Sequence, residues 1–149
     1  MYRRILVAAD GSETFKLALN EAVAPAKVHQ SRLRIVHVID AASLFTGDSY
    51  YANLEKIESG LIEAGKTVLA EALATTEAAG IGAETRLVEI EAMNVRVADM
   101  IVQEAKAWPA ELIVVGTHGR RGLSYLFLGS TAEGVVRTAT VPVLLIRSK

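Results

Sequence analysis

The residues of this chain best suited to chemistry are glycines that follow a short apolar run in its last third. Their spacing is Gly-x2-Gly-x9-Gly-Ser, at Gly116, Gly119, Gly129 and Ser130. Glycine lets backbone N–H groups approach an anion without a Cβ in the way, and a helix start adds unsatisfied N–H donors and the positive end of a dipole. The pattern therefore predicts a site for nucleotide phosphates, and the ordinary alternative is a set of turns. Ser130 also suits a helix N-cap, a role compatible with phosphate binding.

The same loop carries charged and titratable side chains. Arg120 and Arg121 are either solvated charges or partners of the bound anion. Histidine is a common general base, but no carboxylate or nucleophile stands at a recognisable spacing from His118, so a packing or hydrogen-bonding role is favoured. Histidines 29, 37 and 118 show no metal-ligand pattern. We therefore expect no catalytic residue and no direct metal ligand.

Alternating apolar and amphipathic segments must position this loop. Five strands are predicted, at residues 5–9, 33–39, 83–90, 112–115 and 141–146. Four helices are predicted between them, at residues 12–29, 53–79, 94–107 and 130–139, and residues 41–52 are interpreted as a loop. This alternation predicts βαβ units, and hence a parallel sheet with right-handed crossovers.

Several residues indicate where these strands lie in the sheet and how the helices begin or end. The charges of residues 83–90 and Pro142 at the start of the last strand favour outer positions in the sheet. Pro25 is expected to kink or shorten the first helix, and Asn94 to cap the third. Asp99 and Glu104 lie on the polar face of that third helix, where we expect them to be solvated.

Ligands of such sheets bind beyond the carboxyl ends of the strands, where the strand order reverses. A reversal between the first and fourth strands would bring Asp10 and the glycine loop into one crevice. Asp10 would then bind a ribose hydroxyl, or a metal through water, and its ordinary alternative is an Asx turn with Gly11 and Ser12 before the first helix. The backbone of Val38, at the end of the second strand, could read an adenine edge.

Length and composition narrow the class of protein. We expect residues 1–149 to form a single domain, and the 51% hydrophobic and 22% charged residues exclude a disordered chain. The net charge of −1 does not favour nucleic acid or an anionic membrane. There is no cysteine, and no apolar run approaches the ~18 residues of a membrane span. A soluble cytoplasmic domain without membrane insertion is therefore predicted.

The chain resembles the universal stress protein family over its whole length. The resemblance lies in residues 5–12, in Val36-His37-Val38, in the strand and glycine loop from Leu112, and in Val141-Pro142-Val143. The family has members that keep these glycines and bind ATP and members that lack them. The resemblance implies the ATP-binding branch and a three-layer, Rossmann-like α/β fold, with a doubly wound five-stranded parallel sheet of order 3-2-1-4-5. Ala8 departs from a frequent proline, and residues 91–92 lack the usual glycine.

The resemblance also implies a ligand and an assembly. It points to ATP with Mg²⁺ held through the phosphates, Asp10 contacting the metal through water, and to a homodimer or higher oligomer that serves an unknown protein partner. The residues assigned to ATP are Ala8, Ala9, Asp10, Ser12, Val38, Gly116, Thr117, His118, Gly119, Arg120, Gly122, Gly129, Ser130, Thr131 and Ala132. The residues assigned to the dimer are Val141, Val143, Leu144, Leu145 and Ile146.

Three functions remain open at this point. The first is a nucleotide-binding regulatory module of the stress response, acting as a dimeric sensor. The second is a slow ATPase or nucleotide-dependent transferase, against which stand the absence of a Gly-x4-Gly-Lys-Ser/Thr loop and of a recognisable base. The third is a ligand-free dimeric scaffold.

Overall fold

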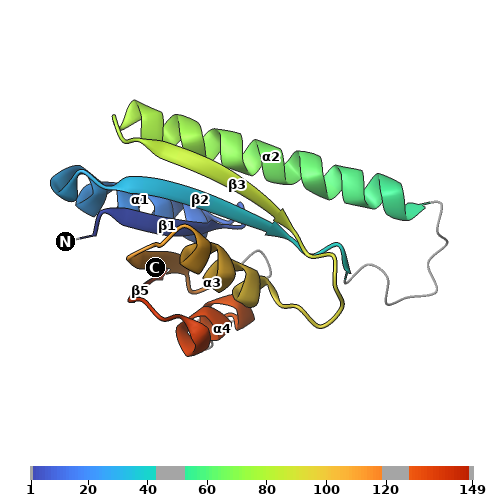
Figure 1. The fold of residues 1–149 in the computed structure, drawn as a ribbon. Helices are drawn as coiled ribbons and strands as arrows, with labels where there is room; N and C mark the ends of the chain where they lie inside the picture. The colour runs from blue at the N-terminus through green and yellow to red at the C-terminus, as the bar shows by residue number, and fades with distance from the viewer. Residues whose placement is uncertain (1, 43–52, 119–127, 148–149) are drawn as a thin grey trace.

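The computed structural model describes residues 2–42, 53–118 and 128–147, which form one parallel sheet with helices on both of its faces (Figure 1). The strands follow the order β3-β2-β1-β4-β5. The elements in chain order are β1 (Arg4–Ala9), α1 (Glu13–His29), β2 (Arg32–Ile39), α2 (Leu54–Ala78), β3 (Ala83–Glu89), α3 (Val97–Ala107), β4 (Leu112–Gly116), α4 (Ser130–Thr138) and β5 (Val143–Ile146).

The strand order reverses between β1 and β4. From β1 the chain builds β2 and then β3 on one side, and it returns through α3 to place β4 on the other side of β1. Ile5 pairs with Leu112 and Val7 with Val114, so two segments far apart in sequence lie side by side. The predicted order is confirmed, and so are the outer positions of β3 and β5.

Burial on both faces explains why the central strands are continuous apolar runs. Ile5 and Val7 belong to the core cluster under α1 and α2, while Leu6, between them, belongs to the cluster under α3 and α4. All three are 0% exposed. A strand covered on both faces needs apolar residues at every position, which is the pattern typical of central strands in a parallel sheet.

The first helix begins where the sequence predicts and passes through its proline. The Oγ of Ser12 accepts a hydrogen bond from the Phe15 N–H at 3.1 Å, which caps α1. The helix continues past Pro25 and ends at His29, followed by Gln30 in the left-handed conformation at φ 54°. Of the two effects expected of Pro25, a kink or a shorter helix, the shortening does not occur.

The start of α3 differs from the prediction. Asn94 adopts φ 70° before the helix, and the residue that precedes the first turn is Arg96. The backbone N–H of Arg96 donates to Asp99 Oδ2 at 3.2 Å, and its guanidinium donates to Oδ1 at 2.9 Å. The bond from the guanidinium, followed by the bond from the backbone N–H, lowers the pKa of Asp99 below its ordinary value. Asp99 is thus engaged at a helix start rather than simply solvated.

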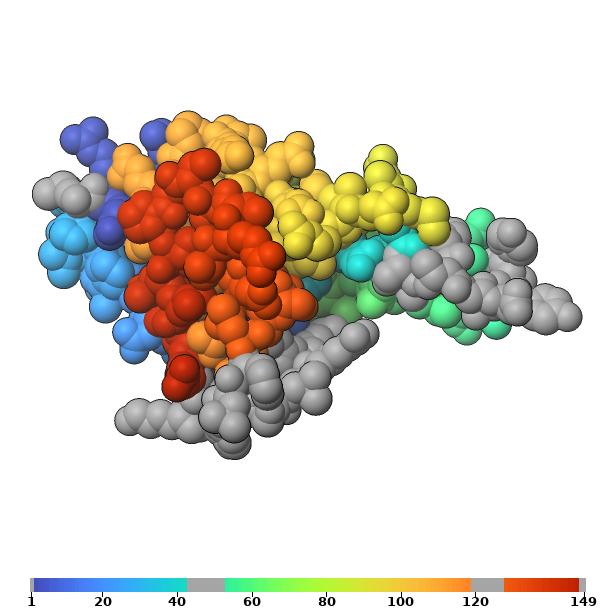
Figure 2. Space-filling view, turned by 90° about the horizontal axis from the view of Figure 1, so that it is seen from below, coloured from blue at the N-terminus to red at the C-terminus, as the bar shows by residue number. Residues whose placement is uncertain are grey.

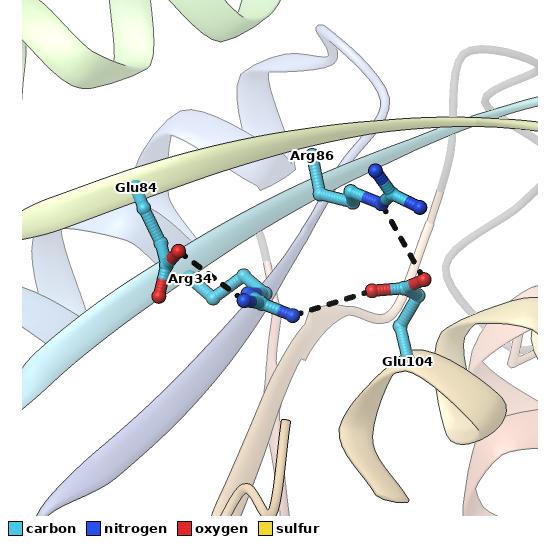
Figure 3. Close-up of polar contacts among 4 residues, drawn as sticks. All are labelled: Arg34, Glu84, Arg86 and Glu104. Carbon is cyan, nitrogen blue, oxygen red and sulfur yellow. Dashed lines mark hydrogen bonds and ion pairs between the residues drawn. The ribbon is translucent and has the colours of Figure 1, made fainter. Parts of the chain in front are cut away.

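The expectation that Glu104 is solvated is also wrong. Its carboxylate lies between Arg34 of β2 and Arg86 of β3, at 3.5 and 3.6 Å, and its side chain is only 15% exposed (Figure 3). Arg34 also contacts Glu84 at 3.2 Å. These four side chains lie on the α3 side of the sheet, near its β3 edge (Figure 3). Charge on an outer strand therefore serves packing against α3 as well as protection of the edge.

Candidate functional site

The end of β1 forms the turn that its sequence predicts. Asp10 Oδ1 accepts a hydrogen bond from the Ser12 N–H at 2.9 Å, and Gly11 lies at φ 76°, a conformation that favours glycine. The Asx turn is thus present. Asp10 is half-buried at the carboxyl edge of the sheet, directly before the first turn of α1.

At the end of β4, the first glycine of the motif has a packing role. A Cβ added to Gly116 would lie 2.8 Å from Cγ2 of Thr14, a buried residue in the first turn of α1. Such a distance is far shorter than the ~3.5–4.0 Å of a normal carbon contact. Gly116 therefore allows the N-terminus of α1 to lie against the end of β4.

Two backbone hydrogen bonds fix both ends of the glycine loop. The Thr117 N–H donates to the Ile146 carbonyl at 2.8 Å, and the Gly129 N–H donates to the Thr117 carbonyl at 2.8 Å. The chain thus leaves β4 and returns to the same point to begin α4. Gly119, Arg120 and Gly122, which we assigned to ATP, lie outside the described residues.

The N-cap of the following helix, α4, lies one residue before Ser130, the residue that the sequence suggested for this role. The N-cap is Gly129, at φ −61° and ψ 149°, and Ser130 is the first helical residue, with no side-chain capping bond present. The first hydrogen bond of the helix runs from the Glu133 N–H to the Gly129 carbonyl at 2.9 Å. The N–H groups of Ser130, Thr131 and Ala132 therefore have no partner within the helix.

The side chain of His118 also has a ring nitrogen that makes no hydrogen bond among the described residues. Its Nδ1 lies 2.9 Å from Oγ1 of Thr117, a residue that is 6% exposed. Its Nε2 is buried and, among the described residues, makes no hydrogen bond. Buried polar atoms of this kind are uncommon and need a partner. The contact with Thr117 is compatible with the packing or hydrogen-bonding role that the sequence favoured, and it leaves Nε2 unexplained.

The remaining assigned residues lie along the same edge. Ala9 pairs with His37 in the register of β1 and β2, so Val38 is one residue further toward the carboxyl end. Ala8 and Val38 belong to the α3 and α4 side of the core. The structure thus brings the ends of β2, β1 and β4 together with the start of α4.

Sequence reasoning missed two residues behind this edge. His37 Nδ1 lies 2.8 Å from the Ala9 carbonyl, and the ring is buried. A Cβ on Gly65 of α2 would lie 2.8 Å from Cδ2 of His37. The close approach of α2 holds the histidine against the backbone of β1. No sequence signal identified this pair, because it depends on how α2 packs on β2, which local pattern does not determine.

Over residues 2–42, 53–118 and 128–147, no three His, Cys, Asp or Glu side chains are grouped so that they could hold a metal ion. In the same ranges no helix is both long and apolar enough to cross a membrane.

The fold and this edge define a doubly wound α/β domain whose loops gather where the strand order reverses. The family model described as the universal stress protein family matches residues 1–147. The chain belongs to the universal stress protein family.

Named relatives agree with this membership. A universal stress protein of Thermus aquaticus is 37% identical over 147 residues, which cover 99% of this chain and 100% of the relative. A crystal structure of a family member from Burkholderia pseudomallei has a TM-score of 0.80 and 35% identity, covering 99% of this chain and 97% of the other. The Archaeoglobus fulgidus universal stress protein, solved in complex with dAMP, has a TM-score of 0.68 and 26% identity, covering 97% and 98%.

Proposed function

We propose that this chain binds ATP at the carboxyl edge between β1 and β4 and acts as a dimeric regulator of the stress response. The observation that carries the proposal is the start of α4, where the N–H groups of three successive residues have no partner in the helix. They stand at the positive end of the helix dipole and directly beside the end of β4, an arrangement that suits phosphate oxygens.

Each part of the nucleotide has a chemically suitable neighbour. The N–H groups and hydroxyls of Ser130 and Thr131 would hold phosphate oxygens, and His118 Nε2 could satisfy its hydrogen bond with the same anion. Asp10 would accept hydrogen bonds from ribose hydroxyls, since one of its oxygens is already fixed by the Ser12 N–H. The backbone at Val38 would face the base. The dAMP complex of the Archaeoglobus fulgidus relative supports an adenine nucleotide as ligand.

Mg²⁺ would enter with the nucleotide in this proposal. The described residues offer no group of three metal ligands, so the ion would be held chiefly by phosphate oxygens and water. Asp10 is the carboxylate placed to contact it through water. The metal would neutralise phosphate charge, while the chain's own N–H groups fix the position of the phosphates.

A regulatory role is favoured over an enzymatic one. His118 contacts the hydroxyl of Thr117, and no carboxylate among the described residues is hydrogen-bonded to it, so it lacks the orienting partner of a general base. ATP hydrolysis, if it occurs, is expected to be far slower than the ~10 s⁻¹ typical of enzymes. A slow ATPase or transferase and a ligand-free scaffold remain the competing functions, and a cytoplasmic location remains a prediction.

Calorimetric titration of nucleotide-stripped protein with ATP, with and without Mg²⁺, tests the proposal. We expect micromolar affinity with one site per chain, together with a rise in thermal midpoint at saturating ligand, because a ligand that binds only the native state stabilises it. Absence of heat and of any thermal shift at millimolar ATP would instead favour the scaffold.

The proposed dimer would form along β5, the outer strand next to β4. Leu144 and Leu145 are 37% and 36% exposed, large fractions for leucines in a strand. In Figure 2 the red C-terminal part of the chain, which contains α4 and β5, forms a continuous area of the surface. An outer strand with exposed apolar side chains is a natural pairing edge.

Charge on this strand is expected to separate the protomers. The double variant Val143→Glu/Leu145→Glu should sediment as a monomer, because pairing would bury the new carboxylates. Leu17→Glu/Val28→Glu is the matched control, since it adds the same two carboxylates at an exposed leucine and an exposed valine of α1, outside β5. A double variant that stays dimeric in sedimentation would place the assembly on another surface.

A further inference from the structure

An open hollow lies at the amino-terminal edge of the sheet, on the opposite side from the proposed ATP site. Its volume is about 660 Å³, within the range of roughly 300–1,000 Å³ common for small-molecule sites. It lies at the end of the molecule that carries the N label in Figure 1, where β1 and β2 begin. Its lining includes Arg3, Arg4, His29, Arg32, Trp108 and Pro109.

Positive charge is concentrated there by the register of the sheet. Arg4 of β1 is paired directly with Arg32 of β2, so their side chains leave the same face of neighbouring strands. Like charges directly opposite one another are destabilising. Among the described residues, none of the guanidinium groups of Arg3, Arg4 and Arg32 forms an ion pair.

Arg34, the next arginine on the same face of β2, is by contrast neutralised by carboxylates. Arg34, two residues after Arg32 on β2, contacts both Glu84 and Glu104 (Figure 3). Its guanidinium carbon also lies 4.9 Å from the centroid of the Trp108 ring, which fixes that ring as a wall of the hollow. Within the described residues, two carboxylates thus pair with Arg34 and none pairs with Arg32.

Neutralisation of helix ends explains only one of the three arginines. Both α1 and α3 end at this edge, and their carbonyl ends attract cations. Arg4 lies close to the end of α3, since its Nε donates to the carbonyl of Pro109, two residues past that helix, at 2.8 Å. The side chains of Arg3 and Arg32 make no such bond in the described part of the chain. The nearby carboxylate of Glu111 accepts from the backbone N–H of Arg3, at 2.6 Å.

We propose that this hollow is a second ligand site, which binds a small anion carrying phosphate groups. The forked guanidinium groups of Arg3 and Arg32 would bind phosphate oxygens in pairs, a geometry for which arginine is better suited than lysine. Arg4 adds charge while it holds the end of α3 in place. The site is independent of the proposed ATP site, because the two lie at opposite edges of the sheet.

The single tryptophan of the chain gives a direct readout. Trp108 lines the hollow, so its fluorescence emission should change on titration with inorganic pyrophosphate at low ionic strength and reach saturation. The variant Arg3→Gln/Arg32→Gln should weaken this binding by about tenfold or more, because bonds to charged donors are lost. The variant Lys56→Gln/Lys66→Gln removes the same formal charge from exposed positions on α2 and should bind within about twofold of the parent, as charge outside the site is screened.

Three results would overturn the proposal. One is the absence of a saturable change at millimolar pyrophosphate, or an equal change with sodium chloride of the same ionic strength. Another is an unchanged affinity of the arginine double variant; if circular dichroism shows that variant to be unfolded, the single variant Arg3→Gln takes its place. The third is an equal loss in Ser130→Pro, which alters the proposed ATP site only and should leave pyrophosphate binding intact.

Discussion

Replacement of Ser130 by proline is expected to weaken ATP binding by about 10- to 100-fold while leaving the fold unchanged, since a hydrogen bond to a charged group contributes about 1.5–3 kcal/mol. Ser130 is the first residue of α4, the position at which proline is most readily accepted in a helix. The substitution removes one N–H donor that has no partner in the helix. It therefore tests the donor that the proposed phosphate site depends on.

The surrounding geometry makes the change selective. Gly129 lies at φ −61° and ψ 149°, an extended conformation compatible with a following proline. The hydrogen bond from the Gly129 N–H to Thr117 is unaffected by it. Ser130→Ala is the control, because it removes the hydroxyl and keeps the N–H, and it should cost less affinity than the proline variant.

Calorimetry with Mg·ATP measures both variants, and circular dichroism and the thermal midpoint verify the fold. Equal affinity in the proline variant and the parent would show that the Ser130 N–H does not bind phosphate. A larger loss in Ser130→Ala than in Ser130→Pro would assign the interaction to the hydroxyl instead.

Those features of the fold that depend on local pattern could be predicted from the sequence. Strands buried on both faces need unbroken apolar runs, so Ile5–Ala9 and Leu112–Val115 were identifiable without a partner. The cap at Ser12 and the Asx turn at Asp10 involve only neighbours in sequence. The resemblance to a known family added the strand order, which local pattern alone does not determine.

The features that could not be predicted depend on contacts across space. Gly116 was assigned to phosphate binding, yet its observed constraint is the side chain of Thr14. Glu104 has the sequence environment of a solvated residue, and its burial results from arginines on two strands. We predicted Asn94 as the cap of α3, and the observed cap is Arg96, because the Asp99 carboxylate accepts from the Arg96 N–H. Intrinsic capping propensities do not predict which of the two residues makes such a bond.

The largest effect on stability is expected from a single methyl group at Gly134. Position 134 lies in α4, and a Cβ there would lie 2.6 Å from the Cβ of Ala98 in α3, which is 2% exposed. Neither atom can rotate away, so the helices must separate. We expect Gly134→Ala to lower the free energy of unfolding by about 1–3 kcal/mol, as overpacking of a core does, despite the gain in helix propensity.

A matched glycine separates this packing effect from propensity. Gly60 lies in α2 with nothing within 4 Å of its added Cβ, so Gly60→Ala should raise the free energy of unfolding by about 0.5–1 kcal/mol. In the Gly134→Ala background, Ala98→Gly should restore part of the lost stability, and the double-mutant cycle then gives a favourable coupling between the two changes. Urea unfolding of the parent, Gly60→Ala, Gly134→Ala, Ala98→Gly and Gly134→Ala/Ala98→Gly measures both quantities. Because α4 carries the proposed phosphate donors, Gly134→Ala should also bind ATP more weakly than the parent, whereas Gly60→Ala should bind it equally well.

Stabilisation by Gly134→Ala equal to that by Gly60→Ala would show that α3 and α4 do not pack this closely. The position of the α4 N-terminus would then depend on the bond between the Gly129 N–H and the Thr117 carbonyl.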